Sequence, residues 1–513
     1  MDKALQEAKY INTIDGAIKY LKSRTTCDLD KTIEFCIASH LGQKRKSGED
    51  YAVHPILVAA FVAGFGGDEA MMKAALLHDV VEDTECSKEQ VAEMFGEDVS
   101  VLVDALTKIS EIREHELPAS ASDEKLIKAA LSFRKMLTSA IADPRALVIK
   151  LCDRTHNLLT LSALAPHKQR RIAEESLVVY APIAYKLGIS KLKNAIEDLS
   201  FEALFPEDYA KIDQYLKEND QAISLKLNEI VKKIEDLLLN NGFERDGFVI
   251  KSRQKHYFSI HQKIQRKGVS LDEVLDLLAV RIIVHTNLEC YKTLGLIHAN
   301  FKPLMGRFKD YIAIPKDNGY QTLHTTLFLS NAIFEAQIRT FEMDEIAELG
   351  PAAHLGYKSG VATDSLKWLK TFEYQSENVE EFYELAKNDL YSDEIFVFSP
   401  TGKAFALPSG ATVLDFAYAI HTDLGNKAVE AYINNARAPL LKELALGDIC
   451  QIVKGDEDVP RCTWVNAVKT SRAKKAIKEL CAHKMKTIDR RVAKNILANT
   501  FGYDYYKLRS WLD

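Results

Sequence analysis

The spacing of apolar residues changes along this chain, and that change limits the folds it can adopt. Through about the first 200 residues, apolar side chains recur at intervals of three and four, for example over 56–62 and 71–76, which predicts helices. The segment 174–238 keeps this spacing, and we expect it to be a helical connector. Further on, β-rich runs predict strands, with a hairpin turn at Ser330-Asn331, over 277–284, 311–314, 325–329 and 332–339.

A third pattern follows these strands. Short strands are expected over 395–398 and 403–407, a helix over 413–421, and a basic helical tail over about the last 55 residues. A chain of 513 residues has room for three or four domains. Its 47% hydrophobic and 27% charged residues are typical of a globular protein. The sequence therefore predicts a multidomain chain with an all-α part, an α+β part, a small β-containing unit and a tail.

No segment predicts export or a membrane span. The longest uncharged stretch, 55–67, is shorter than a bilayer requires. The start lacks a basic region followed by an apolar run. The eight cysteines form no CxxC pair and are scattered through apolar segments, so we expect reduced thiols in a cytoplasmic protein.

The net charge of −6 conceals two basic runs. Residues 251–268 contain six Lys or Arg and no acid, and residues 469–494 contain ten against two acids. Either run taken alone is more simply a solvated helix face. Together they indicate two anionic partners, a nucleotide and an RNA.

Four residues of the helical part offer two imidazoles and two carboxylates, a set suited to a divalent ion such as Mn²⁺: His54, His78, Asp79 and Asp153. Asp153 is followed at intervals of three, four and seven by His156, Asn157 and Thr160, which places them on one helix face. A polar stripe on a buried helix needs partners, and a metal and its substrate would supply them. For any one of these residues alone, capping or surface hydrogen bonding is the alternative.

The sequence around these residues resembles a known family. Residues 40–54, with the loop Arg45-Lys46-Ser47, and 77–84, with Glu82-Asp83, are similar to the hydrolase domain of the RelA/SpoT homologues, members of the HD phosphohydrolase superfamily that make and destroy (p)ppGpp. The resemblance implies that the four residues above hold the metal and that the loop holds the guanine nucleotide. It implies that Glu82 and Asp83 assist hydrolysis and that Asn157 and Thr160 contact substrate. Leu159 departs from the family, in which Arg is common.

A second set of residues is suited to nucleotide phosphates. The run 251–268 supplies cations for a triphosphate: Arg253, Lys255, Lys263, Arg266 and Lys267. The stretch 306–325, which includes His324, supplies further cations, a turn and a ring for stacking on a purine: Arg307, Lys309, Lys316, Asn318-Gly319 and Tyr320. In the expected strand 334–339, Glu335, Gln337 and Arg339 share one face. The simpler reading is an amphipathic strand with a wet side, but residues 335–340 resemble a motif of the same family, so we expect this face to bind substrate.

These stretches are similar to the synthetase domain of the same family, and 306–325 resembles its G-loop. The resemblance implies an ATP site with the following residues: Arg253, Lys255, Ser259 and Lys263, with Arg281 stacking against Arg253 around the adenine. Asp276 and Glu335 would hold Mg²⁺ on ATP, and Glu335 would help deprotonate the ribose 3′-OH of GDP or GTP, which attacks the β-phosphate and releases AMP. His354 matches another family residue, whereas Leu355 replaces the usual Trp.

The unit 390–455 resembles a TGS domain, a β-grasp module. The resemblance implies contact with the CCA end of deacylated tRNA through His421, and the basic tail is suited to ribosomal RNA. A histidine at a helix C-terminus that interacts with the helix dipole is an equally good account of His421. Because the chain lacks the zinc cysteines of long homologues, we expect a truncated C-terminal regulatory region.

The expected domains are an all-α HD-type hydrolase domain over 1–165, a helical connector over 166–205, an α+β nucleotidyltransferase-like synthetase domain over 206–372, the TGS domain over 390–455 and a basic tail over 456–513. We expect a bifunctional enzyme that transfers pyrophosphate from ATP to GDP or GTP and hydrolyses (p)ppGpp. The alternatives are a chain with one silent site and an RNA-binding sensor with vestigial catalysis. Intact residue sets at both sites, and the loop Arg307-Phe-Lys-Asp310, favour two working sites.

Overall fold

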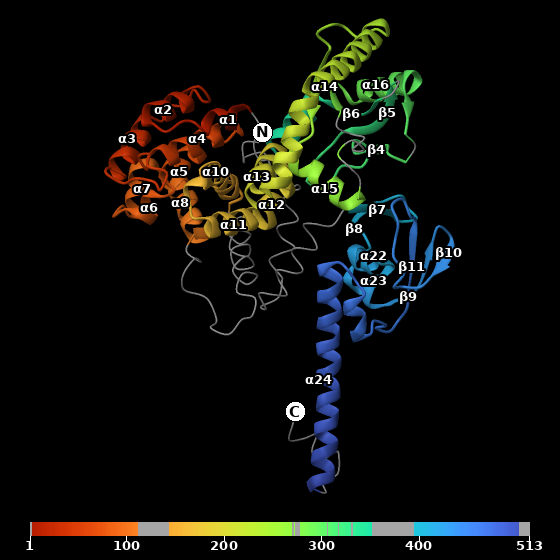
Figure 1. The fold of residues 1–513 in the computed structure, drawn as a ribbon. Helices are drawn as coiled ribbons and strands as arrows, with labels where there is room; N and C mark the ends of the chain where they lie inside the picture. Colours follow the sequence, from red (N-terminus) through yellow and green to blue (C-terminus); the bar gives the residue numbers. More distant parts are fainter. Residues whose placement is uncertain are drawn as a thin grey trace. The chain divides into compact units, whose positions relative to one another are not determined.

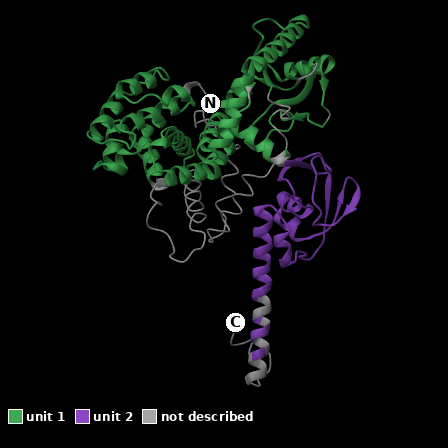
Figure 2. Cartoon of the chain, in the orientation of Figure 1, with its two compact units in different colours: residues 1–373 green, residues 374–513 purple. Residues whose placement is uncertain are grey.

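The computed structural model divides the chain into two compact units, residues 1–373 and 374–513 (Figure 2). Three predicted residues, Asp276, His354 and Leu355, lie outside the residues that it describes, as do the side chains of Arg266 and Lys267. The described residues are 3–110, 143–268, 271, 278–304, 306–316, 318–329, 332–350 and 394–501.

The first unit begins with a helical part, as the apolar spacing predicts (Figure 1). Helix α4 is buried from Val53 to Val62 because its residues are apolar on nearly every side, so other helices must surround it. Short side chains fix where helices begin: the Asp68 carboxylate accepts from the Met71 amide at the start of α5, and Ser87 and Gln90 form a capping box on α7. The helices are α1 (Lys3–Ala8), α2 (Ile14–Lys22), α3 (Asp30–Ser39), α4 (Val53–Gly64), α5 (Glu69–Leu77), α6 (Val80–Asp83), α7 (Lys88–Phe95), α8 (Glu97–Ser110) and α10 (Arg145–Leu159).

The expected connector is helical but divided. Gly188 has a φ of 73°, a left-handed conformation that ends one helix, and Phe205 precedes Pro206, which disfavours helical backbone at Phe205. The corner between α12 and α13, at residues 187–189, lies next to the second site described below. The segments are the short turn Leu161–Ala163, α11 (Pro166–Glu175), a π-helical turn (Ser176–Tyr180), α12 (Ala181–Lys186), α13 (Ser190–Leu204) and α14 (Pro206–Asn240).

The rest of the first unit is built on a mixed six-stranded sheet with the order β1-β2-β6-β5-β3, in which β4 pairs with β5. Strands β2 and β6 are parallel and the other pairs are antiparallel. The elements are β1 (Phe248–Gln254), α15 (Tyr257–Lys267), β2 (Leu278–Val284), α16 (Asn287–Asn300), β3 (Lys302–Pro303), β4 (Lys309–Asp310), β5 (Leu323–Leu329), β6 (Ala332–Thr340) and α17 (Phe341–Leu349).

The two faces of this sheet differ in character. On one face, Val280 and Ala336 belong to a core that includes Ile230 of α14 and Ile297 of α16. On the opposite face, the register pairs Ala279 with both Arg253 and Glu335. One step along the same face, it pairs Gln337 with both Arg281 and His324. Because side chains alternate along a strand, the polar residues of β1, β2, β5 and β6 gather on one surface.

One strand expectation is wrong. Residues 311–314 form a turn, because the Asp310 carboxylate accepts hydrogen bonds from the backbone amides of Ile312 and Ala313 at 3.0 and 2.8 Å. This side-chain turn outweighs the β-rich composition of the run. The other predicted strands are present, and Leu329 pairs with Ala332 across the expected hairpin.

The second unit contains a three-stranded sheet of order β10-β9-β11 and a two-stranded sheet of β7 and β8. Asn434 and Asn435 both have positive φ, which suits the tight two-residue turn between β9 and β10. The predicted order of all-α, α+β and small β-containing parts is thus confirmed. The elements are β7 (Glu394–Phe398), β8 (Ala404–Pro408), α22 (Val413–Ile420), α23 (Thr422–Asn426), β9 (Ala428–Ile433), β10 (Ala436–Ala438), β11 (Cys450–Lys454), the turn Cys462–Asn466 and α24 (Ser471–Phe501).

Asp415, a fully buried carboxylate, joins α22 to the start of α24. It accepts from the backbone amide and hydroxyl of Thr412, both at 2.8 Å, within a capping box. It also accepts from the amides of Lys469 and Thr470, at 3.0 and 2.7 Å, and from the Thr470 hydroxyl at 2.7 Å. This carboxylate therefore satisfies donors at the starts of two helices that are more than fifty residues apart.

The expectation of reduced thiols is wrong for two cysteines. Cys462 and Cys481 form a disulfide, because the turn Cys462–Asn466 packs against α24 and brings their Cα atoms to 5.7 Å. Cys152 and Cys290 are examples of buried thiols that remain free. Burial raises the pKa of Cys290 to about 12.

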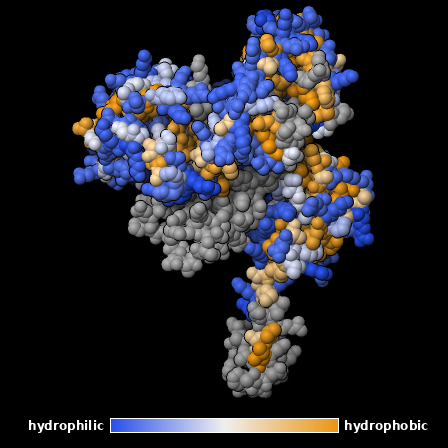
Figure 3. Space-filling model, in the orientation of Figure 1, coloured by the Kyte–Doolittle hydropathy of each residue, from blue (hydrophilic) through white to orange (hydrophobic). Residues whose placement is uncertain are grey.

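Hydrophobic residues are exposed among hydrophilic ones on the face drawn in Figure 3. On α24, Met485, Val492 and Ile496 are 52%, 48% and 58% exposed. Their spacing of seven and four places them along one face of the helix. In the described part of the chain, no helix has both the length and the apolar character needed to span a membrane.

Replacing Asp415 with Ala should loosen the junction between α22 and α24. Hydrogen bonds to a charged group contribute about 1.5–3 kcal/mol each, so losing those from Lys469 and Thr470 should lower the free energy of unfolding of this unit by roughly 3 kcal/mol or more. Hydrogen exchange of the full chain, read from peptides that cover 466–475, should show faster exchange in this variant. Asp423→Ala, which removes an exposed carboxylate paired with Lys427 and Lys454, is the control and should leave these peptides unchanged.

Candidate functional sites

The first cluster lies among the N-terminal helices. His54 lies in α4, His78 and Asp79 lie between α5 and α6, and one ligand atom from each falls within 4.8 Å of the others. The fourth predicted ligand, Asp153 of α10, lies outside that set, but its Oδ1 is 3.3 Å from His54 Nε2. The structure therefore brings the four predicted residues together around one point.

The protonation of His78 indicates what this point requires. His78 Nδ1 lies 2.7 Å from the carbonyl of Ala75, which fixes the hydrogen on Nδ1 and leaves a lone pair on Nε2. That Nε2 is buried without a hydrogen-bond partner among the described residues, and it lies 3.2 Å from Asp79 Oδ1. A nitrogen lone pair and a carboxylate oxygen at this distance repel each other unless a cation, which can be a proton or a metal ion, lies between them. The donor set therefore fits a divalent metal.

Charge at the cluster is compatible with metal binding. Burial and the nearby Arg45 lower the pKa of His54 to about 4, so its imidazole is neutral and able to ligate. Burial opposes ionisation of Asp153, but Lys150, whose Nζ is 2.8 Å away, and His54 hold its pKa well below the usual value. His156 Nδ1 lies 2.9 Å from His54 Nδ1 and orients that ring.

Some of the predicted substrate and catalytic residues are close to the ligands. Arg45 donates to Asn157 Oδ1 at 2.8 Å and lies 3.5 Å from the Thr160 hydroxyl. Lys46 and Ser47 are exposed at the tip of the loop that Arg45 begins. Together these residues form a polar rim next to the ligands.

Glu82 and Asp83 are exposed on α6. The Tyr51 hydroxyl lies 3.0 Å from Asp79 Oδ2 and 2.8 Å from Asp83 Oδ2, and burial and both carboxylates raise its pKa. No sequence pattern pointed to Tyr51 or Lys150, although Tyr51 lies in the segment 40–54 that resembles the hydrolase domain of the family.

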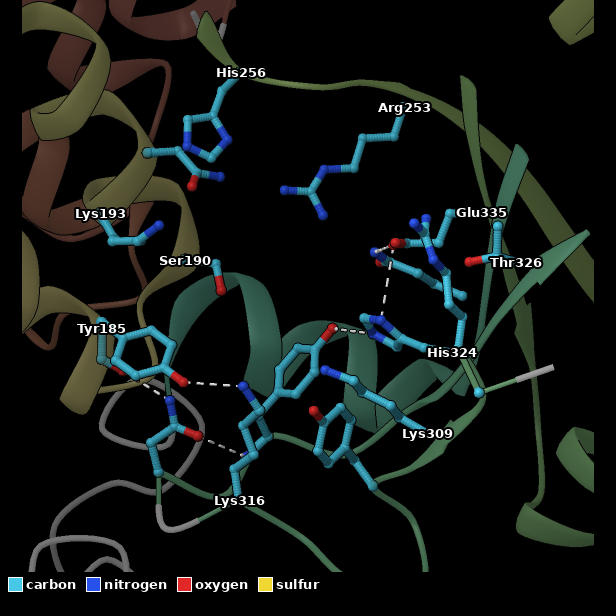
Figure 4. A pocket seen from close by; sticks show the side chains of 17 residues that line it. Tyr185, Ser190, Lys193, Arg253, His256, Lys309, Lys316, His324, Thr326 and Glu335 are labelled. Atoms are coloured by element: carbon cyan, nitrogen blue, oxygen red, sulfur yellow. Dashed lines mark hydrogen bonds and ion pairs between the residues drawn. The ribbon is translucent and has the colours of Figure 1, made fainter. Parts of the chain in front are cut away.

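The second cluster is a cavity of about 520 Å³ above the polar face of the sheet (Figure 4). Nine of the predicted residues line it: Arg253, Arg307, Lys309, Lys316, Asn318, Tyr320, His324, Glu335 and Gln337. The five described Lys and Arg side chains of its wall, which include Lys193, face one carboxylate, Glu335. This excess of positive charge suits a polyphosphate.

The other predicted residues of this region lie around the cavity. Lys255 and Lys263 do not line it, but each lowers the pKa of Glu335, so both lie near that carboxylate. Burial lowers the pKa of Lys255, while a hydrogen bond with Lys263 and the charge of Glu335 oppose that shift. Ser259 lies on α15, on the segment between these two lysines.

Two predicted arginines have other partners. Arg339, which is 1% exposed, lies 2.5 Å from Asp344, and Arg281 lies 2.9 Å from Asp344 and 2.8 Å from Glu348. Neither arginine lines the cavity, and the expected stacking of Arg281 on Arg253 around the adenine stays a prediction. No sequence pattern described above points to Asp344 and Glu348 of α17. Their spacing of four, which places them on one helix face, is the signal that could have identified them.

A chain of contacts crosses the cavity floor. Gln337 donates to Glu335 Oε1 at 2.7 Å, His324 Nδ1 lies 3.7 Å from the same oxygen, and His324 Nε2 lies 3.0 Å from the Tyr320 hydroxyl. Burial lowers the pKa of His324, which keeps its imidazole neutral. Burial opposes ionisation of Glu335, but His324, Gln337 and the two lysines lower its pKa. Glu335 is therefore ionised and able to hold a cation or a proton.

In the second unit, His421 ends α22 and begins α23. Its Nδ1 accepts from the Asp423 amide at 3.1 Å, so the imidazole caps the short helix while the residue remains exposed. This geometry accounts for His421 structurally and leaves an exposed ring.

Three family models match the chain in succession. Residues 32–190 match the HD domain, residues 252–362 match the region found in RelA / SpoT proteins, and residues 395–454 match the TGS domain. The first and second matches contain most of the first and second clusters.

Relatives resemble the chain over most of its length. GTP pyrophosphokinase of Myxococcus xanthus is 42% identical over 464 residues, 88% of this chain and 60% of the relative. The bifunctional (p)ppGpp synthase/hydrolase SpoT of Escherichia coli K12 is 39% identical over 452 residues, 86% of this chain and 63% of the relative. The chain thus spans somewhat less than two thirds of the length of these relatives.

Solved structures show a weaker likeness. Small alarmone synthetase 1 of Bacillus subtilis, bound to its product pppGpp, is 23% identical with a TM-score of 0.24, and covers 35% of this chain and 94% of its own. A metazoan orthologue of SpoT that hydrolyses ppGpp is 23% identical with a TM-score of 0.24, and covers 38% of this chain and 97% of its own. The relatives at about 40% identity and the three successive domain matches show that the chain belongs to the RelA/SpoT family.

Proposed function

We propose that the chain is a bifunctional enzyme that makes (p)ppGpp from ATP and GDP or GTP and also hydrolyses it. The observation that carries this proposal is the presence of two separate sites of different chemistry in one unit. One is a buried His/Asp cluster suited to a metal, and the other is a cationic cavity in which Glu335 is the carboxylate among the described lining residues. The proposed division is hydrolase 1–165, connector 166–205, synthetase 206–372, TGS domain 390–455 and tail 456–513.

For hydrolysis, we assign the metal ligands to His54, His78, Asp79 and Asp153, with Mn²⁺ as the ion. A metal held there lowers the pKa of a bound water and offsets charge on the phosphate. Arg45, Lys46, Ser47, Asn157 and Thr160 would bind the guanine nucleotide. They would orient its 3′-pyrophosphate towards the metal cluster.

The residues suited to proton transfer at this site lie on α6. Glu82 and Asp83 would accept the proton of the attacking water, and the Tyr51 hydroxyl, 2.8 Å from Asp83, would hold that carboxylate in place. The water oxygen would bond to the phosphorus attached to the 3′-oxygen, the bond between that phosphorus and the 3′-oxygen would break, and the 3′-oxygen would take up the proton that the carboxylates accepted. The products are GDP or GTP and pyrophosphate.

For synthesis, the polar face of the sheet would bind both substrates. Arg253, Lys255, Ser259 and Lys263 would hold the phosphates of ATP, with Arg307 and Lys309 next to them. The guanine would stack on Tyr320, near Lys316, Asn318 and His324. Arg281, Gln337 and Arg339 would maintain the surrounding network.

Glu335 is the group suited to the chemical step. It is ionised and mostly buried, so it would help hold Mg²⁺ together with Asp276 and would take the proton of the ribose 3′-OH. The 3′-oxygen attacks the β-phosphorus of ATP, and AMP leaves with the α-phosphate. The cationic wall offsets the charge that develops on the transferred group.

For the second unit, we propose contact with deacylated tRNA through the exposed face of His421 and with the ribosome through the basic helix α24. Ten Lys or Arg against two acids over 469–494 support binding to RNA phosphates. Because the proposed substrates and partners are cytosolic, we place the protein in the cytoplasm.

Asp79→Asn should abolish hydrolysis and spare synthesis. Losing a charged ligand should lower Mn²⁺-dependent release of pyrophosphate from ppGpp by at least about 100-fold. AMP formation from ATP and GDP should stay at the wild-type rate. Glu69→Gln, an exposed residue that pairs with Lys73, is the control for a surface change in the same region. Retained Mn²⁺-dependent hydrolysis in Asp79→Asn would remove the metal-site assignment.

Glu335→Gln should have the opposite pattern. The amide keeps the size of the side chain but holds neither cation nor proton, so kcat for AMP formation should fall by about 100- to 1,000-fold. Hydrolysis of ppGpp should continue. Glu342→Gln, an exposed acid in the first turn of α17, should leave both reactions unchanged. If the wild type performs only one reaction, the chain has one silent site, and if it performs neither, the proposal of an enzyme fails.

A further inference from the structure

The cavity over the sheet has a side that comes from the helical part of the chain. Tyr185 lies in the last turn of α12, Ser190, Lys193 and Asn194 lie near the start of α13, and all four line the cavity. Tyr185 and Ser190 fall within the residues matched to the HD domain, 32–190, and none of the four falls within 252–362. In Figure 4, Tyr185, Ser190 and Lys193 lie on one side of the cavity and Glu335, His324 and Thr326 on the other.

We propose that this corner of α12 and α13 is a third side of the guanine-nucleotide site, in which Tyr185 positions the purine-binding loop and Lys193 binds a phosphate of the nucleotide. The proposal rests on the proposed synthetase function. It assigns part of that site to a segment in which neither the sequence nor the domain matches suggested it.

Tyr185 holds the loop at two points. Lys316 Nζ donates to the Tyr185 hydroxyl at 3.0 Å, and Asn318 Nδ2 donates to the Tyr185 carbonyl at 2.8 Å. This carbonyl lies in the last turn of α12, where it also accepts from the Gly188 amide at 3.0 Å. Both donors flank the turn that leads to Tyr320, so Tyr185 fixes the approach of that ring.

Aromatic rings also surround the Lys316 ammonium group. Its Nζ lies 5.4 Å from the ring centroid of Tyr185, 5.0 Å from that of Tyr311 and 5.8 Å from that of Tyr320. Cations are attracted to ring faces at these distances. The hydroxyl of Tyr185 is the oxygen that orients the ammonium group within this cage.

Lys193 offers a positive charge on the same side. Its Nζ lies 2.8 Å from Glu197, a carboxylate that also contacts His256 Nε2 at 3.0 Å. Glu197 would therefore keep one partner if Lys193 turned towards a ligand. Lys255 and Lys263 lie near Glu335, and Arg253 and Arg307 lie near Lys255. With these cations and Lys309 placed beside the phosphates of ATP, Lys193 and Lys316 remain in the described lining for the second nucleotide.

The corner is fixed to the sheet region, as a binding wall must be. A Cβ at Gly350, which follows α17, would meet Ile189 at 2.7 Å and the carbonyl of Leu187 at 2.8 Å, so the two backbones touch. Further along α13, the Asp198 carboxylate accepts from the Phe258 amide at the start of α15, at 2.9 Å. These contacts hold the wall at both ends.

Titration calorimetry of the full chain with GDP alone tests the proposal. Tyr185→Phe keeps the ring and removes the hydroxyl, and Lys193→Gln removes the charge. We expect each variant to raise Kd for GDP by about 5- to 20-fold, with Tyr320→Ala as the reference for a lost site residue. The controls are Tyr209→Phe and Lys211→Gln, which lie on α14 outside the cavity lining and should bind GDP as the wild type does.

Steady-state synthesis separates positioning from structural damage. We expect KM for GDP to rise in both variants while KM for ATP and the rate of ppGpp hydrolysis stay within twofold of wild type. A change confined to ATP would overturn the proposal, because Lys193 would then act through His256 and α15. Unchanged GDP affinity in both variants would also overturn it. A wild type that binds GDP but makes no ppGpp would contradict the synthetase function. The GDP titrations of the two variants would still decide whether the corner binds the nucleotide.

Discussion

Arg339 is almost completely buried and remains charged because Asp344 lies against it and Glu348 lies nearby. The same constraint applies at Asp153, held by Lys150 and His54, and at Asp415, held by donors from two helices. A buried charge without partners is strongly destabilising. In each case some of the partners come from a different helix or strand, so the need to satisfy buried charge joins separate elements of the fold.

The register of the sheet gathers polar side chains at the second site. Pairing of β1, β2, β6 and β5 places polar residues at corresponding positions on four strands, and a slip of one residue in any pair would turn one row towards the core of α14 and α16. Arg253, Glu335 and His324 are near one another because of that register. The apolar face specifies how the strands pair, and this pairing also fixes the relative positions of the side chains on the polar face.

Much of this architecture could be predicted from sequence because it depends on local periodicity. The alternation over 334–339 predicts both the strand and the face that carries Glu335. Composition was misleading at 311–314, where the Asp310 carboxylate forms a turn that a count of β-branched residues does not detect. The pairing of Cys462 with Cys481 depends on packing of a turn against α24, which spacing does not encode.

The residues that sequence reasoning missed are those whose role depends on long-range contact. Tyr185 and Lys316 are 131 residues apart, and neither segment carries a pattern that points to the other. The family resemblance suggests substrate roles for Arg281 and Arg339, whereas their contacts with α17 depend on how that helix folds back after β6. Residue chemistry identifies candidate site residues, but only the folded chain shows which other residues they contact.

The contact between Gly350 and the corner at residues 187–189 has a consequence for exchanging segments between relatives. The match to the RelA / SpoT region begins at residue 252, yet the cavity depends on side chains from residue 185 onwards. A hybrid that took only 252–362 from another member would set a foreign loop against this chain's Tyr185 and place a foreign residue at the position where Gly350 touches Leu187 and Ile189. The exchangeable module is therefore longer than the matched region, and its natural start lies before α12, within the segment matched to the HD domain.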